Sequence, residues 1–106
     1  MEKDLKNQVA LVTGGSSGIG KSISIILAAA GAKVAVNYHS DKKGADATVT
    51  EIKKNGGEAF AVKGDVGSEK AVDQMFEKVF SKYENLDILV SNAGVQKDAA
   101  FDKMTL

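Results

Sequence analysis

Val9-Ala10-Leu11-Val12-Thr13-Gly14-Gly15-Ser16-Ser17-Gly18-Ile19-Gly20 is the stretch that decides the fold of this 106-residue sequence. Its four apolar residues indicate a buried strand, and the glycine-rich turn after them leads directly into a helical pattern. Glycines let the backbone turn sharply and let a ligand come close, while the unpaired N–H groups and positive dipole end of the next helix attract an anion. We therefore predict that this stretch binds the phosphates of a nucleotide.

Two phosphate-binding patterns fit these residues. Gly15-x4-Gly20-Lys21-Ser22 matches the P-loop, whose lysine reaches the β- and γ-phosphates and whose hydroxyl holds magnesium. Thr13-Gly14-x3-Gly18-x-Gly20 fits a dinucleotide-binding turn instead, although the usual G-x-G-x-x-G spacing is absent. A P-loop enzyme needs a second apolar strand that ends in aspartate, whereas the run 86–90 is followed by Ser91-Asn92-Ala93-Gly94. The dinucleotide interpretation is favoured, and a P-loop nucleotide hydrolase is the alternative.

Composition narrows the class of protein. Lys and Arg number 14 and Asp and Glu number 14, so neither a nucleic-acid-binding face nor an acidic tail is indicated. Cysteine is absent, which excludes disulfides and cysteine-rich zinc sites, and no metal site is predicted. The residues 1–7 are too charged for a signal peptide, and no apolar run is long enough to span a membrane. We expect one cytoplasmic domain over residues 1–106 with no membrane partner.

Strand-like and helix-like segments alternate along the chain. The expected strands cover 9–12, 33–38, 58–63 and 86–90, and the expected helices cover 18–30, 41–54 and 68–83. Asp41 and Ser68 are expected to cap the second and third helices, Gly31 to stop the first, and Asn55-Gly56-Gly57 to end the second.

Each expected helix carries apolar residues at helical spacing, which we interpret as core packing. One face of the first helix carries Ile19, Ile23, Ile26, Leu27 and Ala30. The second carries Ala45, Val49 and Ile52, and the third carries a broad stripe of Val72, Met75, Phe76, Val79, Phe80 and Tyr83.

This alternation predicts an α/β fold with a doubly wound parallel sheet, four strands in the order 3-2-1-4, and right-handed crossovers. In such a sheet the ligand crevice lies where the strand order reverses, between the first and fourth strands. Thr13-Gly14 follows the first strand and Asn92-Ala93-Gly94 follows the fourth, so both patterns are expected at that crevice.

Thr13-Gly14-x3-Gly18-x-Gly20 together with Asn92-Ala93-Gly94 resembles the two signatures of the short-chain dehydrogenase/reductase family. The whole chain resembles the N-terminal half of such an enzyme, especially the glucose 1-dehydrogenase-like and 3-oxoacyl-carrier-protein reductase branches. The resemblance implies an NAD(P)-binding Rossmann fold and hydride transfer between a secondary alcohol, such as a sugar, and a ketone or lactone. The chain is expected to be truncated.

The resemblance also implies roles for individual residues. Asp65 would accept a hydrogen bond from the adenine amine, although a turn residue between Gly64 and Gly67 is the alternative reading of Asp65. Asn92 would partly hold the strands together. The pyrophosphate and ribose would be held by Gly14, Gly18, Ile19 and Gly20, the adenosine phosphates would lie near Ser16 and Ser17, the adenine would contact Asp65 and Val66, and the inner ribose would contact Asn92, Ala93 and Gly94.

Cofactor choice depends on the end of the second strand, where enzymes that prefer NAD usually place an acidic residue for the ribose 2′-hydroxyl. Tyr38 stands where that acid is expected, and Asn37, His39 and Ser40 could donate hydrogen bonds to a 2′-phosphate. Related sequences often carry arginine in place of His39, and an exposed loop residue is the alternative reading of this histidine. We predict that NADP is preferred and NAD tolerated.

The residues for the chemical step are expected beyond Leu106. In the family a tyrosine acts as general acid and base, with a lysine four residues later and a serine upstream. Tyr38-x3-Lys42 fits the spacing but lies at the adenosine end, so it is rejected and no catalytic residue is assigned. A non-catalytic dinucleotide-binding module is the alternative to an enzyme.

The edge of the fourth strand, along 88–90, is expected to drive self-association, and the complete enzyme is expected to be a homo-oligomer.

Overall fold

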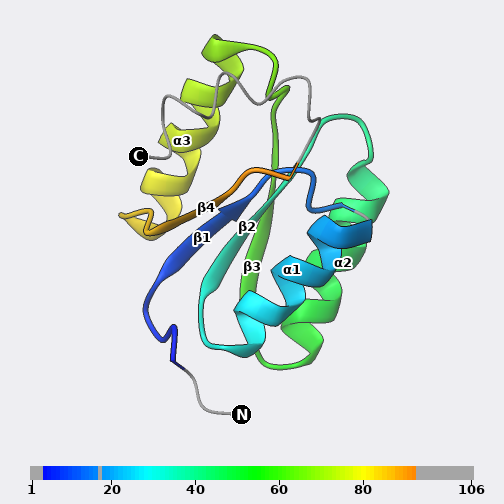
Figure 1. The fold of residues 1–106 in the computed structure, drawn as a ribbon, viewed down its shortest axis with the longest axis vertical. Helices are drawn as coiled ribbons and strands as arrows, with labels where there is room; N and C mark the ends of the chain where they lie inside the picture. The colour runs from blue at the N-terminus through cyan, green and yellow to red at the C-terminus, as the bar shows by residue number, and fades with distance from the viewer. Residues whose placement is uncertain (1–3, 17, 93–106) are drawn as a thin grey trace.

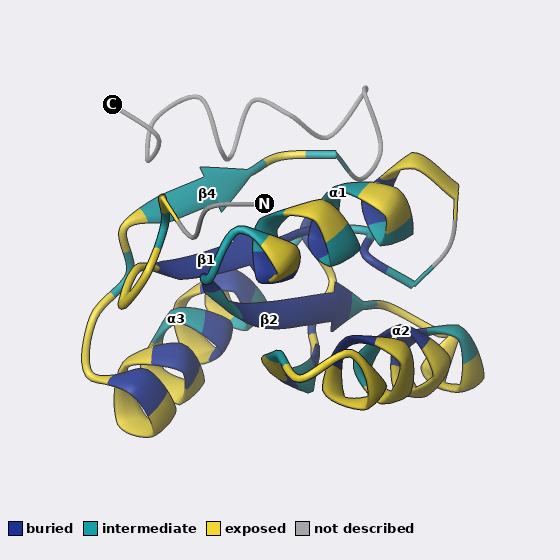
Figure 2. Cartoon of the chain, turned by 90° about the horizontal axis from the view of Figure 1, so that it is seen from below, coloured by how far each residue is buried: buried dark blue, intermediate teal, exposed yellow. Residues whose placement is uncertain are grey.

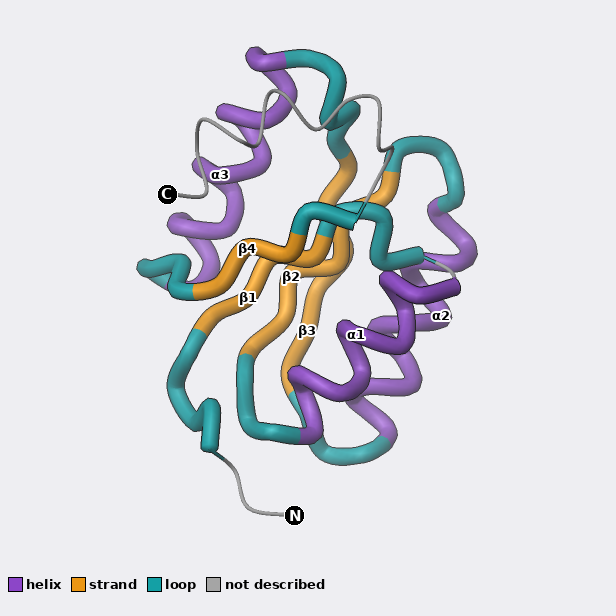
Figure 3. The backbone as a smooth tube through the Cα atoms, viewed as in Figure 1, coloured by secondary structure: helices purple, strands orange, loops and turns teal. Residues whose placement is uncertain are grey.

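The computed structural model describes residues 4–16 and 18–92. Four parallel strands form one sheet in the order β3-β2-β1-β4, and Figure 3 shows them side by side. Both the α/β class and the strand order predicted from the sequence are thereby confirmed. The elements in chain order are β1 Val9–Val12, α1 Gly18–Ala29, β2 Lys33–Tyr38, α2 Lys42–Lys54, β3 Glu58–Lys63, α3 Glu69–Tyr83 and β4 Ile88–Val90.

Helices cover both faces of the sheet: α1 and α2 lie on one face and α3 lies on the other (Figure 1). Side chains of β1 alternate between these layers, because Leu11 belongs to the core under α3 and Val12 to the core under α1 and α2. All four residues of β1 are buried, whereas those of β4 are only half-buried, as the colours of Figure 2 show. The interior of the sheet is formed by β1 together with β2, whose residues 34–37 are also buried.

The helix boundaries follow the predicted capping residues. The Asp41 carboxylate accepts a hydrogen bond from Gly44 N at 2.9 Å, and the Ser68 hydroxyl accepts one from Ala71 N at 3.2 Å. Gly31 follows α1 with φ of 107°, a left-handed conformation that costs glycine little. Local polar chemistry thus sets where each helix begins or ends.

The predicted apolar face of α1 is wrong in part. The side of α1 that faces the sheet carries the small residues Gly20, Ser24 and Ala28, whereas Ile19 is 71% exposed and Ile26 is 61% exposed. The small residues let the helix axis approach the sheet closely, since a Cβ on Gly20 would overlap the carbonyl oxygen of Gly14. The buried face of α1 is therefore the one whose small side chains let the helix lie close to the sheet, and not the one with the largest apolar side chains.

Two smaller predictions also need correction. Phe80 was expected in the core stripe of α3 but is half-exposed, because Val79 beside it already occupies the position that faces the sheet. The fourth strand was expected over 86–90 but covers only 88–90. Asp87 nevertheless pairs with β1, since its backbone N donates to Val9 O at 2.8 Å and its carboxylate accepts from Val9 N at 2.8 Å.

Parallel strands bring their carboxyl ends to one edge of the sheet. The loops that follow β1, β2, β3 and β4 therefore share this edge. The predicted cofactor-binding residues that the structure describes follow a strand end or begin α1, except Asn37, which lies within β2 one residue before its end. Of the helices over residues 4–16 and 18–92, none is long and apolar enough to cross a membrane.

Tyr83, the last residue of α3, lies at the opposite edge of the sheet. Its ring packs edge-on against Phe60 with centroids 5.3 Å apart, and Lys33 Nζ lies 5.6 Å from the ring centroid. The hydroxyl oxygen is buried, and among the described residues no group forms a hydrogen bond with it. Burial raises the pKa of Tyr83 above its usual value of 10.0, and the nearby Glu58 carboxylate raises it further.

We expect the free energy of unfolding to fall as the pH rises above about 10, because the unfolded chain can release the Tyr83 proton there and the folded chain cannot. Tyr83→Phe should reduce this loss and should be at least as stable as the parent near pH 7, since it removes a buried hydroxyl without a partner. Urea unfolding followed by circular dichroism at several pH values measures both effects. Tyr38→Phe, which removes the other tyrosine, is the control. An unchanged alkaline loss in Tyr83→Phe would contradict the prediction.

Candidate functional site

The glycine-rich turn after β1 is held in place by the end of β2. Gly14 adopts φ of 65°, and its backbone N donates to Asn37 Oδ1 at 3.1 Å. Gly15 N donates to Asn37 O at 2.9 Å. The turn is thus fixed before any ligand arrives, which lowers the entropic cost of binding an anion at the start of α1.

The first turn of α1 closes on the ends of β1 and β4. A Cβ on Gly20 would overlap Gly14 O and would come within 2.7 Å of Asn92 Nδ2. Asn92 Nδ2 donates to Gly14 O at 3.3 Å, and Asn92 N donates to Thr13 Oγ1 at 2.8 Å. The two sequence patterns therefore meet at one place, and Asn92 ties β4 to the turn as expected.

Helix α2 supports the turn from behind. Thr48 Oγ1 is buried and shares its one proton between Gly44 O at 2.9 Å and Gly15 O at 3.2 Å. A Cβ on Gly44 would come within 2.5 Å of Ser16 O. Neither residue was predicted to belong to the site. The sequence pattern that could have identified them is their spacing: Thr48 stands four residues after Gly44, on the same helix face as Ala45 and Ile52.

Asn37 was predicted to donate to a cofactor phosphate, and the structure gives it another role. Its side chain is buried, and its Oδ1 accepts from Gly14 N. Its Nδ2 lies 3.1 Å from Gly64 O and 3.0 Å from Met75 Sδ. Both ends of the amide are therefore engaged within the protein, so we remove Asn37 from the phosphate-binding set and assign it to positioning the turn.

The other residues at the end of β2 are accessible. His39 and Ser40 are exposed in the loop between β2 and α2. His39 Nε2 lies 4.0 Å from Asp65 Oδ2, so two side chains predicted for the adenosine end of the cofactor lie side by side.

The structure shows the turn role of Asp65, and its contact with the adenine stays a prediction. Its Oδ1 accepts from Gly67 N at 2.8 Å, which is the turn role, while the carboxylate remains half-exposed. Val66 behind it is buried in the core under α3. The turn thus fixes the carboxylate at the carboxyl edge of the sheet, where its second oxygen can meet a ligand.

The start of α1 leaves room for a ligand. Gly18 has φ of 59°, and among the described residues no atom outside its own neighbourhood lies within 4 Å of the position that a Cβ would occupy. Ile19 next to it is exposed. The predicted contacts Ser17, Ala93 and Gly94 lie outside the described residues.

The P-loop alternative gains no support from the geometry. Lys21 Nζ lies 3.9 Å from Glu51 Oε1 on α2, so its side chain reaches the neighbouring helix. Strand β4, which pairs with β1, is followed by Ser91 and Asn92, and neither residue supplies a carboxylate for a metal.

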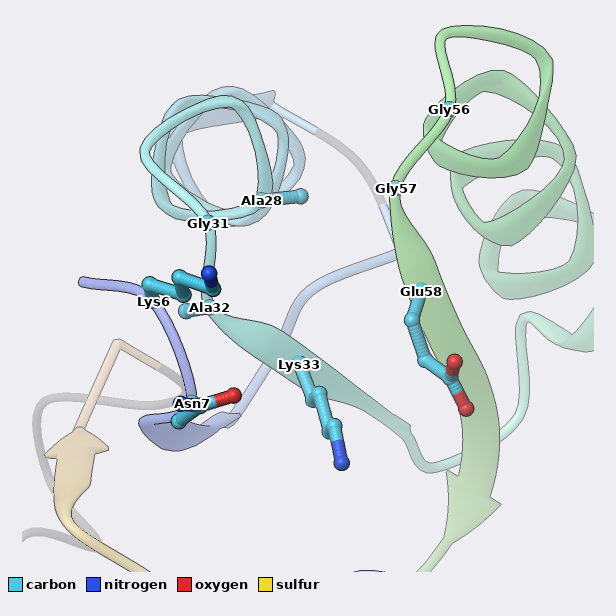
Figure 4. A pocket seen from close by; sticks show the side chains of 9 residues that line it. All are labelled: Lys6, Asn7, Ala28, Gly31, Ala32, Lys33, Gly56, Gly57 and Glu58. Carbon is cyan, nitrogen blue, oxygen red and sulfur yellow. The ribbon is translucent and has the colours of Figure 1, made fainter. Parts of the chain in front are cut away.

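A pocket of about 440 Å³ lies at the other edge of the sheet (Figure 4). Its lining includes Lys33 and Glu58, the first residues of β2 and β3, together with Gly31 and Gly57. Since the predicted cofactor contacts follow the strands, this pocket is separate from the candidate site.

The chain belongs to the short-chain dehydrogenase/reductase family, because the family model for short chain dehydrogenases matches residues 8–106. A 3-oxoacyl-acyl-carrier-protein reductase from Synechocystis sp. is 48% identical over 102 residues, which cover 96% of this chain and 41% of that protein. A short-chain dehydrogenase from Burkholderia cenocepacia, solved in complex with NADP, superposes with a TM-score of 0.82 at 43% identity and covers 86% of this chain and 37% of that one.

Similarity also extends to a protein of comparable length. The short-chain dehydrogenase/reductase homolog YusS from Bacillus subtilis is 43% identical over 98 residues, which cover 92% of this chain and 90% of that protein. The chain otherwise spans about two fifths of the length of the relatives it matches, such as the Synechocystis reductase. It corresponds to the NAD(P)-binding region of the family.

Gly20→Ala is expected to destabilise the protein by about 2 kcal/mol or more, because the added Cβ overlaps the Gly14 carbonyl group. Gly18→Ala is the matched comparison: it places alanine in a left-handed conformation without overlap and should cost about 1 kcal/mol. Chemical denaturation of both variants measures the difference. If Gly20→Ala is as stable as Gly18→Ala, the close approach of α1 is not the constraint described here.

Proposed function

We propose that this chain is the cofactor-binding part of an NAD(P)-dependent oxidoreductase that interconverts a secondary alcohol and a ketone or lactone by hydride transfer. The observation that carries the proposal is the junction at which Gly20 closes on Gly14 and Asn92. It joins a glycine turn, a helix N-terminus and the end of the neighbouring strand at the point where the strand order reverses.

The residues at this junction fit a dinucleotide. The α1 N-terminus offers backbone N–H groups and a positive dipole end to the pyrophosphate, and the open space beside Gly18 leaves room for it. Asp65 and Val66 are proposed to contact the adenine, and Asn92 is proposed to contact the inner ribose. When bound, the cofactor supplies the hydride chemistry, and these residues hold and orient it.

NADP as the preferred cofactor, with NAD tolerated, is part of the proposal. No carboxylate stands at the end of β2, since Tyr38 is its last residue and His39 and Ser40 follow it. A carboxylate there would repel a 2′-phosphate, whereas the exposed imidazole and hydroxyl can donate hydrogen bonds to it. With Asn37 engaged in the core, the phosphate contacts reduce to His39 and Ser40.

The described residues supply binding, not the chemical step. Lys42 Nζ donates to Asp46 at 2.7 Å, and this hydrogen bond raises the pKa of Lys42. Tyr38 ends β2 and Lys42 begins α2, at the adenosine end of the proposed site, so we do not assign them as the tyrosine–lysine pair of the family. The serine, tyrosine and lysine of the complete enzyme are proposed to lie outside this sequence.

The substrate class is proposed only in outline. A secondary alcohol is proposed from family membership, and the sugar implied by the resemblance stays a prediction. The cytoplasmic location likewise stays a prediction. A non-catalytic dinucleotide-binding module is the second candidate function. The match to YusS, which covers 90% of that protein, favours this second candidate because a relative of similar length to this chain exists.

Calorimetric titration with NADPH, NADH and Mg-ATP tests the proposal. We expect saturable NADPH binding that is tighter than NADH binding and no magnesium-dependent ATP binding. His39→Asp should lower the NADPH preference at least about fivefold, because a carboxylate would then face the 2′-phosphate. His39→Asn is the matched control, since asparagine has nearly the same size as aspartate but carries no charge. Absence of dinucleotide binding would overturn the proposal, and an unchanged ratio in His39→Asp would overturn the phosphate contact.

Hydride transfer separates the two candidate functions. An enzyme half should support ketone reduction when the remaining part of a longer relative is supplied, whereas a binding module should bind the cofactor and never turn it over. Stopped-flow absorbance of the nicotinamide measures the turnover.

We further propose that the isolated chain self-associates through β4. Among the described strands β4 pairs only with β1, and its three residues Ile88, Leu89 and Val90 are half-buried, so it presents an edge and part of an apolar face. Sedimentation at tens of micromolar should detect species larger than 11.1 kDa. Ile88→Lys should reduce them and Ser81→Lys, which adds the same charge on α3, should not. A monodisperse monomer would contradict this proposal.

A further inference from the structure

The side-chain amide of Asn37 joins two loops at the carboxyl edge of the sheet. Asn37 is 2% exposed. Its Oδ1 accepts from Gly14 N at 3.1 Å, in the turn after β1, and its Nδ2 donates to Gly64 O at 3.1 Å, in the loop between β3 and α3. One buried group therefore holds both the turn expected to meet the pyrophosphate and the loop that carries Asp65.

A thioether sulfur is the closest acceptor to the amide nitrogen of Asn37. Met75 of α3 is fully buried, and its Sδ lies 3.0 Å from Asn37 Nδ2. The carbonyl oxygens of Tyr38 and Val62 lie farther from this nitrogen, at 3.3 and 3.4 Å. The two nearest acceptors, Gly64 O and Met75 Sδ, match the two amide protons in number.

Gly64 leaves the space in which the sulfur lies. A Cβ on Gly64 would come within 2.7 Å of both Cγ and Sδ of Met75. Gly64 does not adopt a positive φ, so the space it leaves, and not its backbone freedom, explains the glycine here. Glycine at this position and methionine on α3 thus belong to one arrangement around Asn37.

Only one orientation of the Asn37 amide satisfies its surroundings. Gly14 N is a donor and must meet the oxygen, whereas Gly64 O and Met75 Sδ are acceptors and must meet the nitrogen. Without the sulfur, a buried N–H would lose its nearest acceptor and could regain a bond only by turning toward the more distant carbonyl oxygens. Because the amide is planar, such a turn would also move the oxygen that holds Gly14.

We propose that Met75 is a positioning residue for dinucleotide binding: its sulfur orients the Asn37 amide, and this amide sets the glycine turn that meets the pyrophosphate. The inference rests on the proposed function and extends that site to a buried side chain of α3. Helical spacing predicted only core packing for Met75, and Met75 does belong to the core under α3. The contact with Asn37 adds a role that depends on the sulfur and not on the size of the side chain.

Met75→Leu tests the role of the sulfur, because it removes the acceptor and nearly keeps the volume. We expect the dissociation constant of NADPH, measured by calorimetric titration, to rise about three- to tenfold, the effect of weakening one buried hydrogen bond. The dissociation constant of NADH should rise by the same factor, since both dinucleotides carry the pyrophosphate. The ratio of the two constants should therefore stay at its parent value.

Val79→Ala is the matched control. Val79 lies one helical turn after Met75 and is fully buried in the same core. Its truncation should destabilise the chain at least as much as Met75→Leu does, because it leaves a cavity. Both dissociation constants should nevertheless keep their parent values in Val79→Ala. Urea unfolding identifies conditions under which both variants are folded.

A second measurement needs no cofactor. In NMR spectra of the free chain, the side-chain amide protons of Asn37 and the backbone amide proton of Gly14 report the two ends of the arrangement. Met75→Leu should shift both sets of signals and should speed the hydrogen exchange of the Gly14 amide. Val79→Ala should leave these signals and this exchange rate at their parent values.

The outcomes distinguish this inference from the proposed function. If Met75→Leu binds both dinucleotides as tightly as the parent chain, or if Val79→Ala weakens them equally, the inference is overturned and the proposed function stands. Unchanged Asn37 and Gly14 signals in Met75→Leu would overturn the inference in the same way. If the parent chain binds neither dinucleotide, the proposed function is overturned and the inference with it.

Discussion

The structure depends on the close approach between the first turn of α1 and the backbone that follows β1. Gly20 permits it, because any Cβ there would overlap the Gly14 carbonyl and crowd the Asn92 amide. With the helix held this near to the sheet, its inner face accommodates only small residues such as Ser24 and Ala28. The same contact holds the N-terminus of α1 against the turn, so packing and the proposed anion binding have one origin.

Buried polar side chains keep this geometry fixed. Asn37 connects the glycine turn with the end of β3, Thr48 connects it with α2, and Asn92 connects it with β4. Each bond satisfies a backbone group that would otherwise be buried at a cost, which makes the network specific as well as stabilising. A binding loop that is held from three sides does not have to be ordered by its ligand.

The two edges of the sheet have different tasks. The carboxyl edge gathers the glycine turn, His39, Asp65 and Asn92, all near the point where the strand order reverses. The amino edge carries Tyr83 against Phe60 and Lys33, where aromatic packing closes the core under α3. Function and packing are thereby separated in space, as in other parallel sheets whose connecting helices cover both faces.

The sequence alone determined the order of elements, the caps at Asp41 and Ser68 and the place where the two signatures meet, because these depend on local patterns and on the way parallel strands align. Tertiary structure decided what periodicity could not. Ile26 and Phe80 fit their apolar stripes yet face solvent, since distance to the sheet and competition with neighbours select the buried face. Asn37 looked like a phosphate ligand, and only the backbone groups around it show that its amide is engaged. The pairing of His39 with Asp65 joins residues 26 positions apart, a proximity that no local pattern encodes and that the parallel alignment of β2 with β3 creates.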